Sequence, residues 1–153
     1  MRAILETAAL CVMIAIASPA FAQAPTAGKA TPVAQAFEHY EMVRAALAAD
    51  SLTDAAAPAK ALAATAAAAG GAAAKKAADL LASAKNIEDA RKTFGDLSTV
   101  LVPIFQAEKI PGTMAYMCSM KDKPWVQRGD KIANPYYGKS MLTCGTVLPP
   151  KGK

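Results

Sequence analysis

Alanine dominates the middle of the chain and restricts the folds that it can adopt. Nineteen of the residues between positions 51 and 100 are alanine, out of 38 in the whole 153-residue chain. Alanine is the best intrinsic helix former, whereas β-sandwiches need many β-branched and aromatic residues. The sequence therefore favours a mainly α fold, and its length suits a single domain without a large catalytic cleft.

Apolar spacing predicts helices throughout residues 33–106. The predicted helices lie at about residues 33–49, 53–69, 72–84 and 86–106. Thr31 can cap the first of them, and Gly70 with Gly71 separates the second from the third. Pro58 is expected to delay the start of the second helix. We expect a three- to four-helix antiparallel bundle, in which the alanine-rich helices are thin and pack closely.

The last predicted helix has the clearest apolar stripe. Asn86 can cap its N-terminus, and Pro103 is expected to kink or end it. The stripe repeats at three- and four-residue steps through Ile87, Ala90, Phe94, Leu97, Leu101 and Ile104. Such a stripe is typical of the seam of a helical bundle.

The first 22 residues have the pattern of a secretory signal peptide. Arg2 precedes the apolar run AALCVMIAIA, and the small-residue triplet Ala20-Phe21-Ala22 follows it. The run is shorter than the ~20 residues that a transmembrane helix needs. We expect cleavage after Ala22, a flexible linker over residues 23–32, and a periplasmic protein with no membrane span in the mature chain.

Residues 107–153 differ from the helical part of the chain. They hold only three alanines, with eight basic and three acidic residues, whereas the preceding part of the mature chain holds eight of each sign. We expect an irregular segment packed on the bundle, so that residues 33–148 form one domain. Short strands at about residues 113–118 and 141–148, with the turn sequence NPYYG between them, would form a β-hairpin.

Sulfur is concentrated in this C-terminal segment. Cys118 and Met120 lie close together, and Met141 and Cys144 follow further along the chain. Thiolate and thioether are soft ligands, so this set favours Cu(I) or Ag(I) over zinc, iron or calcium. The sequence therefore predicts a soft-metal site that is formed by Cys118, Met120, Met141 and Cys144.

Four further residues could assist such a site. Met117 lies beside Cys118, and the indole of Trp125 could cover a soft cation through cation–π attraction. His39, the single histidine, lies near Met42 on the first predicted helix, where the two could also bind copper. The ordinary alternatives are core packing for the methionines and Trp125, and a surface position without a role for His39.

Two other states of the cysteines remain open. In an oxidising compartment Cys118 and Cys144 can form a disulfide. The protein would then be a disulfide-stapled helical interaction module of the cell envelope that holds no metal. The third possibility is that both thiols stay unpaired.

Most enzyme classes find no support in the sequence. The chain has no G-x-S-x-G, no nucleotide-binding loop and no c-type haem motif, and a single histidine excludes His-pair metal sites. We therefore expect no catalysis, no haem and no nucleotide. Export argues against a nucleic acid as the partner of the basic segment.

The C-terminal motifs resemble those of an exported bacterial domain-of-unknown-function family. The residues that resemble it are Tyr116-Met117-Cys118-Ser119-Met120, Trp125 and Asn134-Pro135-Tyr136-Tyr137-Gly138-Lys139-Ser140-Met141-Leu142-Thr143-Cys144-Gly145. The run from Asn86 to Phe94, followed by Leu97 and Ser98, resembles the family's last helix. Ser119 departs from the family pattern, which has proline there, and this change removes no sulfur ligand.

Members of this family are small exported proteins or extensions of periplasmic adaptor subunits of heavy-metal efflux systems. The resemblance therefore implies a role in handling Cu(I) or Ag(I) in the periplasm. It implies Cys118, Met120, Met141 and Cys144 as ligands, and an adaptor or another efflux component as the partner.

Overall fold

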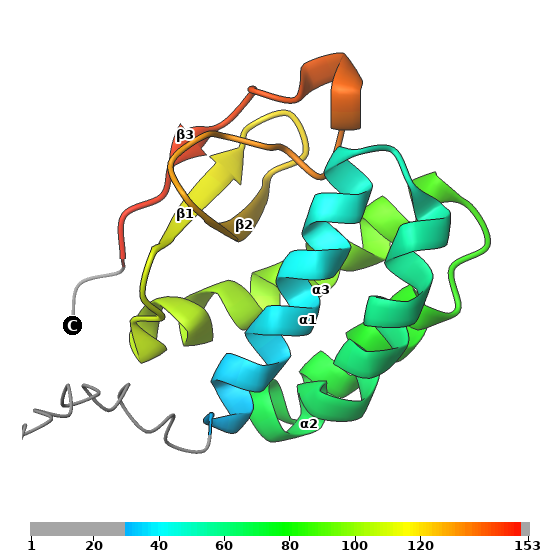
Figure 1. Ribbon diagram of the computed structural model, residues 1–153, viewed down its shortest axis with the longest axis vertical. Coiled ribbons are helices and arrows are strands. Elements are labelled where there is room, and N and C mark those ends of the chain that lie inside the picture. Colours follow the sequence, from blue (N-terminus) through cyan, green and yellow to red (C-terminus); the bar gives the residue numbers. More distant parts are fainter. Residues whose placement is uncertain (1–29, 151–153) are drawn as a thin grey trace, which may run out of the picture.

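The computed structural model describes residues 30–150, so the expected signal peptide and residues 23–29 of the expected linker lie outside the described part. Figure 1 shows three helices with a small antiparallel sheet beside them. The helices are α1 (Pro32–Ala48), α2 (Leu52–Ala82) and α3 (Ile87–Glu108). The strands are β1 (Thr113–Cys118), β2 (Lys123–Arg128) and β3 (Thr146–Val147), and a short 3-10 helix, η1 (Gly138–Met141), precedes β3. The prediction of a mainly α fold is confirmed.

The predicted caps begin α1 and α3. The Thr31 hydroxyl accepts a hydrogen bond from the Ala34 N–H at 3.1 Å, and the Asn86 side chain accepts one from the Asp89 N–H at 2.8 Å. These bonds satisfy N–H groups that have no partner within the helix. Pro103 was expected to kink or end α3, and the second alternative is wrong, because α3 continues to Glu108. This proline lies on the exposed side of the helix, where water can reach the carbonyl that it leaves unbonded.

α2 contains the second and third predicted helices, so four separate helices are not what the structure shows. The predicted break is a kink within one element, with non-helical backbone at Gly70 and at Gly71, whose φ is 68° and ψ is −161°. Only glycine adopts that last conformation readily. A Cβ atom at Gly70 would lie 3.0 Å from Leu101 Cδ2, so α2 approaches α3 closely here. Pro58 lies inside α2 and does not delay its start at Leu52.

The small sheet contains both predicted strand regions, but the strand that forms a hairpin with the first of them is one that was not predicted. β1 coincides with the strand predicted at 113–118, and it pairs antiparallel with β2, which the sequence analysis did not predict. The strand expected at 141–148 is reduced to the two residues of β3, because η1 and a turn occupy the chain before it. The strand order is β2-β1-β3.

Aromatic side chains join the helices to the sheet. They form neighbouring pairs with ring centroids 4.7 to 6.3 Å apart. The residues are Phe37, Tyr40, Phe94, Phe105, Tyr116, Trp125 and Tyr136. The Val126 N–H of β2 donates to the Tyr40 hydroxyl at 3.4 Å, so β2 lies against the helices (Figure 1). No helix within residues 30–150 has the length and apolarity to span a bilayer.

Candidate functional site

The sheet places the two cysteines on neighbouring stretches of backbone. The antiparallel register of β1 with β3 pairs Met117 with Thr146. Continuing this register by one residue sets Gly145 opposite Cys118, and Cys144 is next along the chain. Both cysteines are free in the structure, with Cys118 fully buried and Cys144 half-buried. The two cysteines therefore lie on neighbouring stretches of backbone at one end of the sheet, and the alternative disulfide is not formed in the structure.

Hydrogen bonds hold Met141 and Cys144 in a single turn. The Cys144 N–H donates to the Met141 carbonyl at 3.1 Å. The fully buried Asn134 side chain donates to the Cys144 carbonyl at 2.7 Å, and the Asn134 N–H donates to the Leu142 carbonyl at 2.7 Å. Both candidate ligands are half-buried. These hydrogen bonds fix the turn that contains Met141 and Cys144, and this turn lies beside the end of β1.

Met120 lies in the turn between β1 and β2, two residues after Cys118, and its side chain is 59% exposed. The neighbouring Lys121 Nζ lies 5.1 Å from the centroid of the Tyr137 ring. This contact brings the turn against the chain that enters η1, which ends at Met141. The fold therefore brings all four candidate ligands to the same end of the sheet, with Met120 in solvent and Cys118 in the core.

Trp125 is a core residue beside this end of the sheet. Its side chain is fully buried, it stacks on Tyr116 with ring centroids 5.3 Å apart, and its indole N–H donates to Gln127 Oε1 at 2.9 Å. Tyr116 and Trp125 are cross-strand partners, so the indole lies on the face of the sheet that also contains Cys118.

The remaining accessory candidates lie apart from the four ligands. Met117 is half-buried and, as the neighbour of Cys118 in β1, lies on the opposite face of the sheet. His39 is half-buried and Met42 is 58% exposed, and both lie on α1, outside the three segments that contain the candidate ligands. Residues 30–150 contain no group of three or more His, Cys, Asp or Glu side chains that could hold a metal ion. A metal ion at this end of the sheet would therefore need thioether ligands beside the cysteines.

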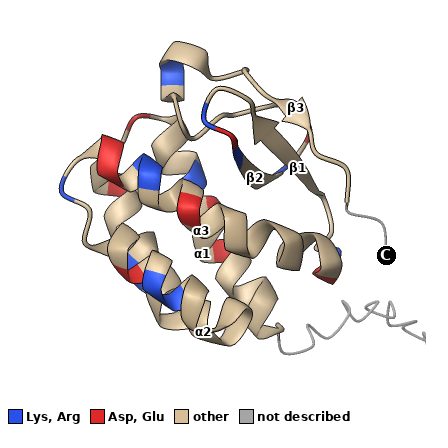
Figure 2. Cartoon of the chain, turned by 180° about the vertical axis from the view of Figure 1, so that it is seen from behind, with Lys and Arg blue, Asp and Glu red and all other residues tan. Residues whose placement is uncertain are grey.

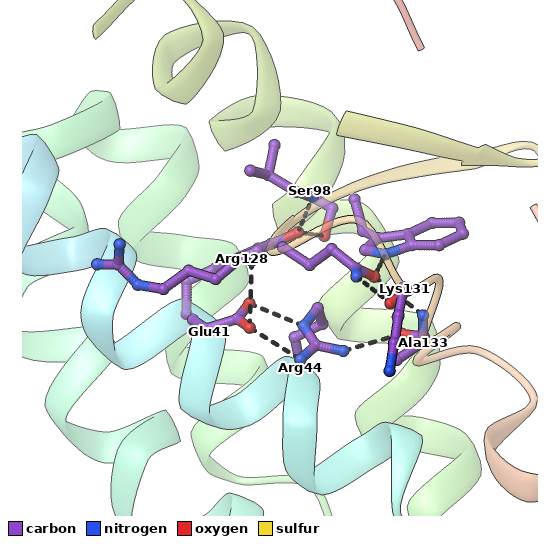
Figure 3. A network of polar contacts seen from close by, with 10 residues as sticks. Glu41, Arg44, Ser98, Arg128, Lys131 and Ala133 are labelled. Atoms are coloured by element: carbon purple, nitrogen blue, oxygen red, sulfur yellow. Dashed lines mark hydrogen bonds and ion pairs between the residues drawn. The ribbon is translucent and has the colours of Figure 1, made fainter. Parts of the chain in front are cut away.

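Polar contacts that the sequence analysis missed hold the chain after β2, as Figure 3 shows. Arg44 of α1 donates to both carboxylate oxygens of Glu41 at 2.8 Å and to the Ala133 carbonyl at 2.9 Å. The buried Gln127 side chain donates to the Lys131 carbonyl at 2.6 Å and accepts from the Ala133 N–H at 3.0 Å. The Arg44–Ala133 contact joins residues that are far apart in the sequence, so no local pattern could indicate it. The other contacts are local, and the Glu41–Arg44 pair has the three-residue spacing of neighbours on one helix.

A second arginine connects α3 to the same part of the chain. Arg91 is buried and donates through Nε to the Pro135 carbonyl at 3.1 Å. Its Nη2 donates to the Asp50 carboxylate at 2.5 Å. Asp50 follows α1, and its other carboxylate oxygen accepts from the Lys139 N–H at 3.1 Å. No sequence pattern indicates that Asp50 and Arg91 are joined to the turn.

These contacts shift the pKa values of acidic groups. The hydrogen bonds from Arg91 and from the backbone of η1 hold the pKa of Asp50 below its usual value. Burial acts to raise the pKa of Asp96, but Lys123 and a second lysine outweigh it and the pKa is lowered. Burial raises the pKa of Tyr136 well above its usual value, so this phenol stays protonated beside the sheet.

The helical part of the chain matches a known family. The family described as "Protein of unknown function (DUF3347)" matches residues 36–112. The match covers the helices and ends before β1, so the four candidate ligands lie outside it. Comparison with characterised proteins and with solved structures finds no match. Membership of a domain-of-unknown-function family is thereby confirmed, while the signature motif and the efflux association stay predictions. Because the match covers half of the chain, the protein belongs to the DUF3347 family of proteins of unknown function.

Proposed function

We propose that the protein is an exported periplasmic protein that binds one soft metal ion, Cu(I) or Ag(I), through Cys118, Cys144, Met120 and Met141. One observation supports this proposal above the others. The register of β1 with β3 sets two free cysteines on adjacent stretches of backbone, with the two methionines on segments at the same end of the sheet. Thiolate and thioether sulfur favour a soft ion over zinc or a hard cation.

The surrounding charges also suit a monovalent ion. Two thiolates and one monovalent cation carry a single net negative charge. Lys121 follows Met120 in the hairpin turn, and Lys139 lies with Met141 in η1, so positive charge is close to both segments. A hard divalent cation would instead require clustered carboxylates. Such a cluster is not found among residues 30–150.

The proposed role is sequestration or transfer of the ion, with no reaction catalysed. The N-terminal signal pattern directs the chain to the periplasm. The exposed Met120 thioether offers a first contact for an arriving or departing ion. The proposed partner is a periplasmic adaptor or another component of a heavy-metal efflux system, which would deliver the ion or receive it.

The placement of the cysteines favours one alternative function. In an oxidising periplasm Cys118 and Cys144, on adjacent antiparallel segments, could join in a disulfide. This bond would stabilise the fold by ~3–4 kcal/mol in the chain-entropy description. The protein would then be a stapled interaction module of the envelope, with no free thiolate for a metal ion.

Native mass spectrometry distinguishes these functions. The chain from Gln23 onward is kept reduced and titrated in parallel with Ag(I), Cu(I) and Zn(II). We expect one retained Ag(I) or Cu(I) and little zinc, with retention lost in the Cys118→Ser/Cys144→Ser double variant. Met120→Leu is expected to weaken retention. Met42→Leu is its matched control, because Met42 is equally exposed but lies on α1.

Two outcomes would count against the metal site. Unchanged Ag(I) retention in the double serine variant would show that the ion binds elsewhere. The second outcome is that protein purified from the periplasm has a mass two hydrogen atoms below that of the reduced form, and that it retains no ion after reduction. The disulfide-stapled module would then be the better description.

A further inference from the structure

The segment that contains Met141 and Cys144 is tied to the helices at one corner of the fold. We call residues 134–145 the strap. Asp50, directly after α1, accepts a hydrogen bond from the Lys139 N–H of the strap at 3.1 Å and one from Arg91 of α3 at 2.5 Å. Arg91 also donates to the Leu47 carbonyl at 3.0 Å and to the Pro135 carbonyl of the strap at 3.1 Å. One carboxylate and one guanidinium therefore join α1, α3 and the strap.

The strap leaves no space for a side chain at Gly138, where it meets Asp50 and Arg91. Gly138 has φ of +55°, and a Cβ atom there would lie 1.9 Å from Asp50 Oδ1 and 2.4 Å from Arg91 Nη2. Glycine lets the backbone approach the two charged groups directly. The strap is thus held against the ion pair by backbone contacts rather than by the exposed side chains of η1.

The strap lies against the face of the sheet that contains Cys118. Tyr136 is almost fully buried, and its hydroxyl donates to the Pro124 carbonyl at 2.5 Å. A Cβ atom at Gly145 would lie 2.4 Å from Trp125 Cη2, so the end of the strap rests directly on the indole. Cys118 itself has no exposed surface. An ion or a reagent therefore reaches its sulfur only when this covering moves.

We infer that Asp50 and Arg91 are positioning residues, which hold the strap closed over Cys118 and set both the access of an ion to that thiol and the placement of Met141 and Cys144. The part of this inference that concerns the ion rests on the proposed metal site. The closure over Cys118 does not, because any reagent that reacts with thiols can report it.

Alkylation of Cys118 measures the closure directly. Reduced Cys144→Ser protein leaves Cys118 as the single thiol of the chain from Gln23 onward, and its reaction with iodoacetamide is followed by mass spectrometry. We expect Asp50→Asn to speed this reaction by about tenfold, because a hydrogen bond to a charged group is removed. Arg91→Lys keeps the charge but loses the forked contacts, and we expect acceleration in the same direction.

Two controls separate the strap from general destabilisation. Asp79→Asn removes an exposed ion pair with Lys75 on α2, and it should leave the rate unchanged. Gly112→Ala strains a glycine at φ +71° with nothing within 4 Å of its Cβ position, so it lowers global stability away from the strap. The Cys118 rate should not follow that loss. The increase in alkylation rate is compared with the loss of unfolding free energy in each variant. If this ratio is the same for Asp50→Asn and Gly112→Ala, Cys118 becomes accessible through global unfolding rather than local opening of the strap, and the inference is wrong.

Silver provides the second readout. If wild-type protein binds Ag(I), Asp50→Asn should bind it faster and hold it more weakly, while Asp79→Asn behaves as wild type. If wild-type protein binds no Ag(I), the proposed function fails, and the alkylation rates still decide whether the strap covers Cys118. Cys118 alkylation that is as fast in the native wild type as in urea would overturn the inference outright.

Discussion

At the scale of single residues, Gly138 is the glycine of the described chain with the least room for a side chain. Its positive φ and its contact with Asp50 both exclude a side chain. We expect Gly138→Ala to cost roughly 2 kcal/mol or more, the sum of backbone strain and steric conflict. Urea unfolding measures this loss. Gly129→Ala is the matched control, because it has a φ of +74° and open space around its Cβ, and it should cost only about 1 kcal/mol. Equal losses of unfolding free energy in the two variants would show that the Asp50 side chain moves aside at little cost.

Tyr40 is a second residue that we expect to be hard to replace, because its buried hydroxyl has two hydrogen-bond partners. It is fully buried, its hydroxyl lies 2.8 Å from the Ser98 hydroxyl, and it accepts from the Val126 N–H at 3.4 Å. Burial raises the pKa of this phenol, so it stays neutral at all ordinary pH values. We expect Tyr40→Phe to lower stability by about 1–3 kcal/mol, because two buried polar groups lose their partner. Combining it with Ser98→Ala should cost less than the sum of the two, and strict additivity would argue against the bond.

At the scale of elements, local patterns predicted those parts of the fold that local interactions stabilise. The caps Thr31 and Asn86 begin α1 and α3, and β1 coincides with the strand expected at residues 113–118. β2 was missed because Pro124 and charged end residues hide a strand that depends on pairing with β1. In the same way, spacing could suggest that Cys118 and Cys144 belong together, but not that Cys118 is buried beneath a strap.

We expect the kink in α2 to depend on its two glycines, Gly70 and Gly71. Gly71 has a backbone conformation that other residues rarely adopt. We expect Gly71→Ala to destabilise the protein by about 1–3 kcal/mol, because α2 must straighten and leave α3 or strain its backbone. Thermal unfolding followed by circular dichroism measures the effect. Ala72→Gly, on the next exposed position, is the control and should cost at most about 1 kcal/mol. A neutral Gly71→Ala would show that the kink has another cause.

Two carboxylates that connect elements make stability depend on pH. The hydrogen bond from Arg91 lowers the pKa of Asp50, and the lysines beside Asp96 lower its pKa against the effect of burial. A depressed folded pKa stabilises the protein above the unfolded value of about 3.9, and this stabilisation is lost as the pH falls through the lower folded value. We therefore expect the unfolding free energy to decrease below about pH 4. The decrease should be smaller in Asp50→Asn and in Asp96→Asn than in the wild type.

At the scale of the whole molecule, the excess of positive charge and both cysteines of the expected mature chain lie outside the helical scaffold. Residues 23–106 hold equal numbers of basic and acidic residues, whereas residues 107–153 hold the excess of positive charge and both cysteines of the expected mature chain. In Figure 2, the β1–β2 turn shows blue on both sides of a red position and η1 shows blue, while the helices show both colours. The helices, which define the family match, therefore act as the support on which a chemically different segment is held.

A metal ion that binds this segment must stabilise the entire fold, because the aromatic core joins the sheet to the helices. Binding to the folded state alone adds about 2.7 kcal/mol at a free-ion concentration one hundred times Kd. For a domain of this size, we expect Ag(I) to raise the Tm of the reduced protein by roughly 10 °C under those conditions. Differential scanning calorimetry measures the shift, and a soft-metal chelator should reverse it. The Met42→Leu variant should keep the whole shift. The Cys118→Ser/Cys144→Ser variant and the oxidised protein should show none, and an equal shift with Zn(II) would mean that sulfur does not select the ion.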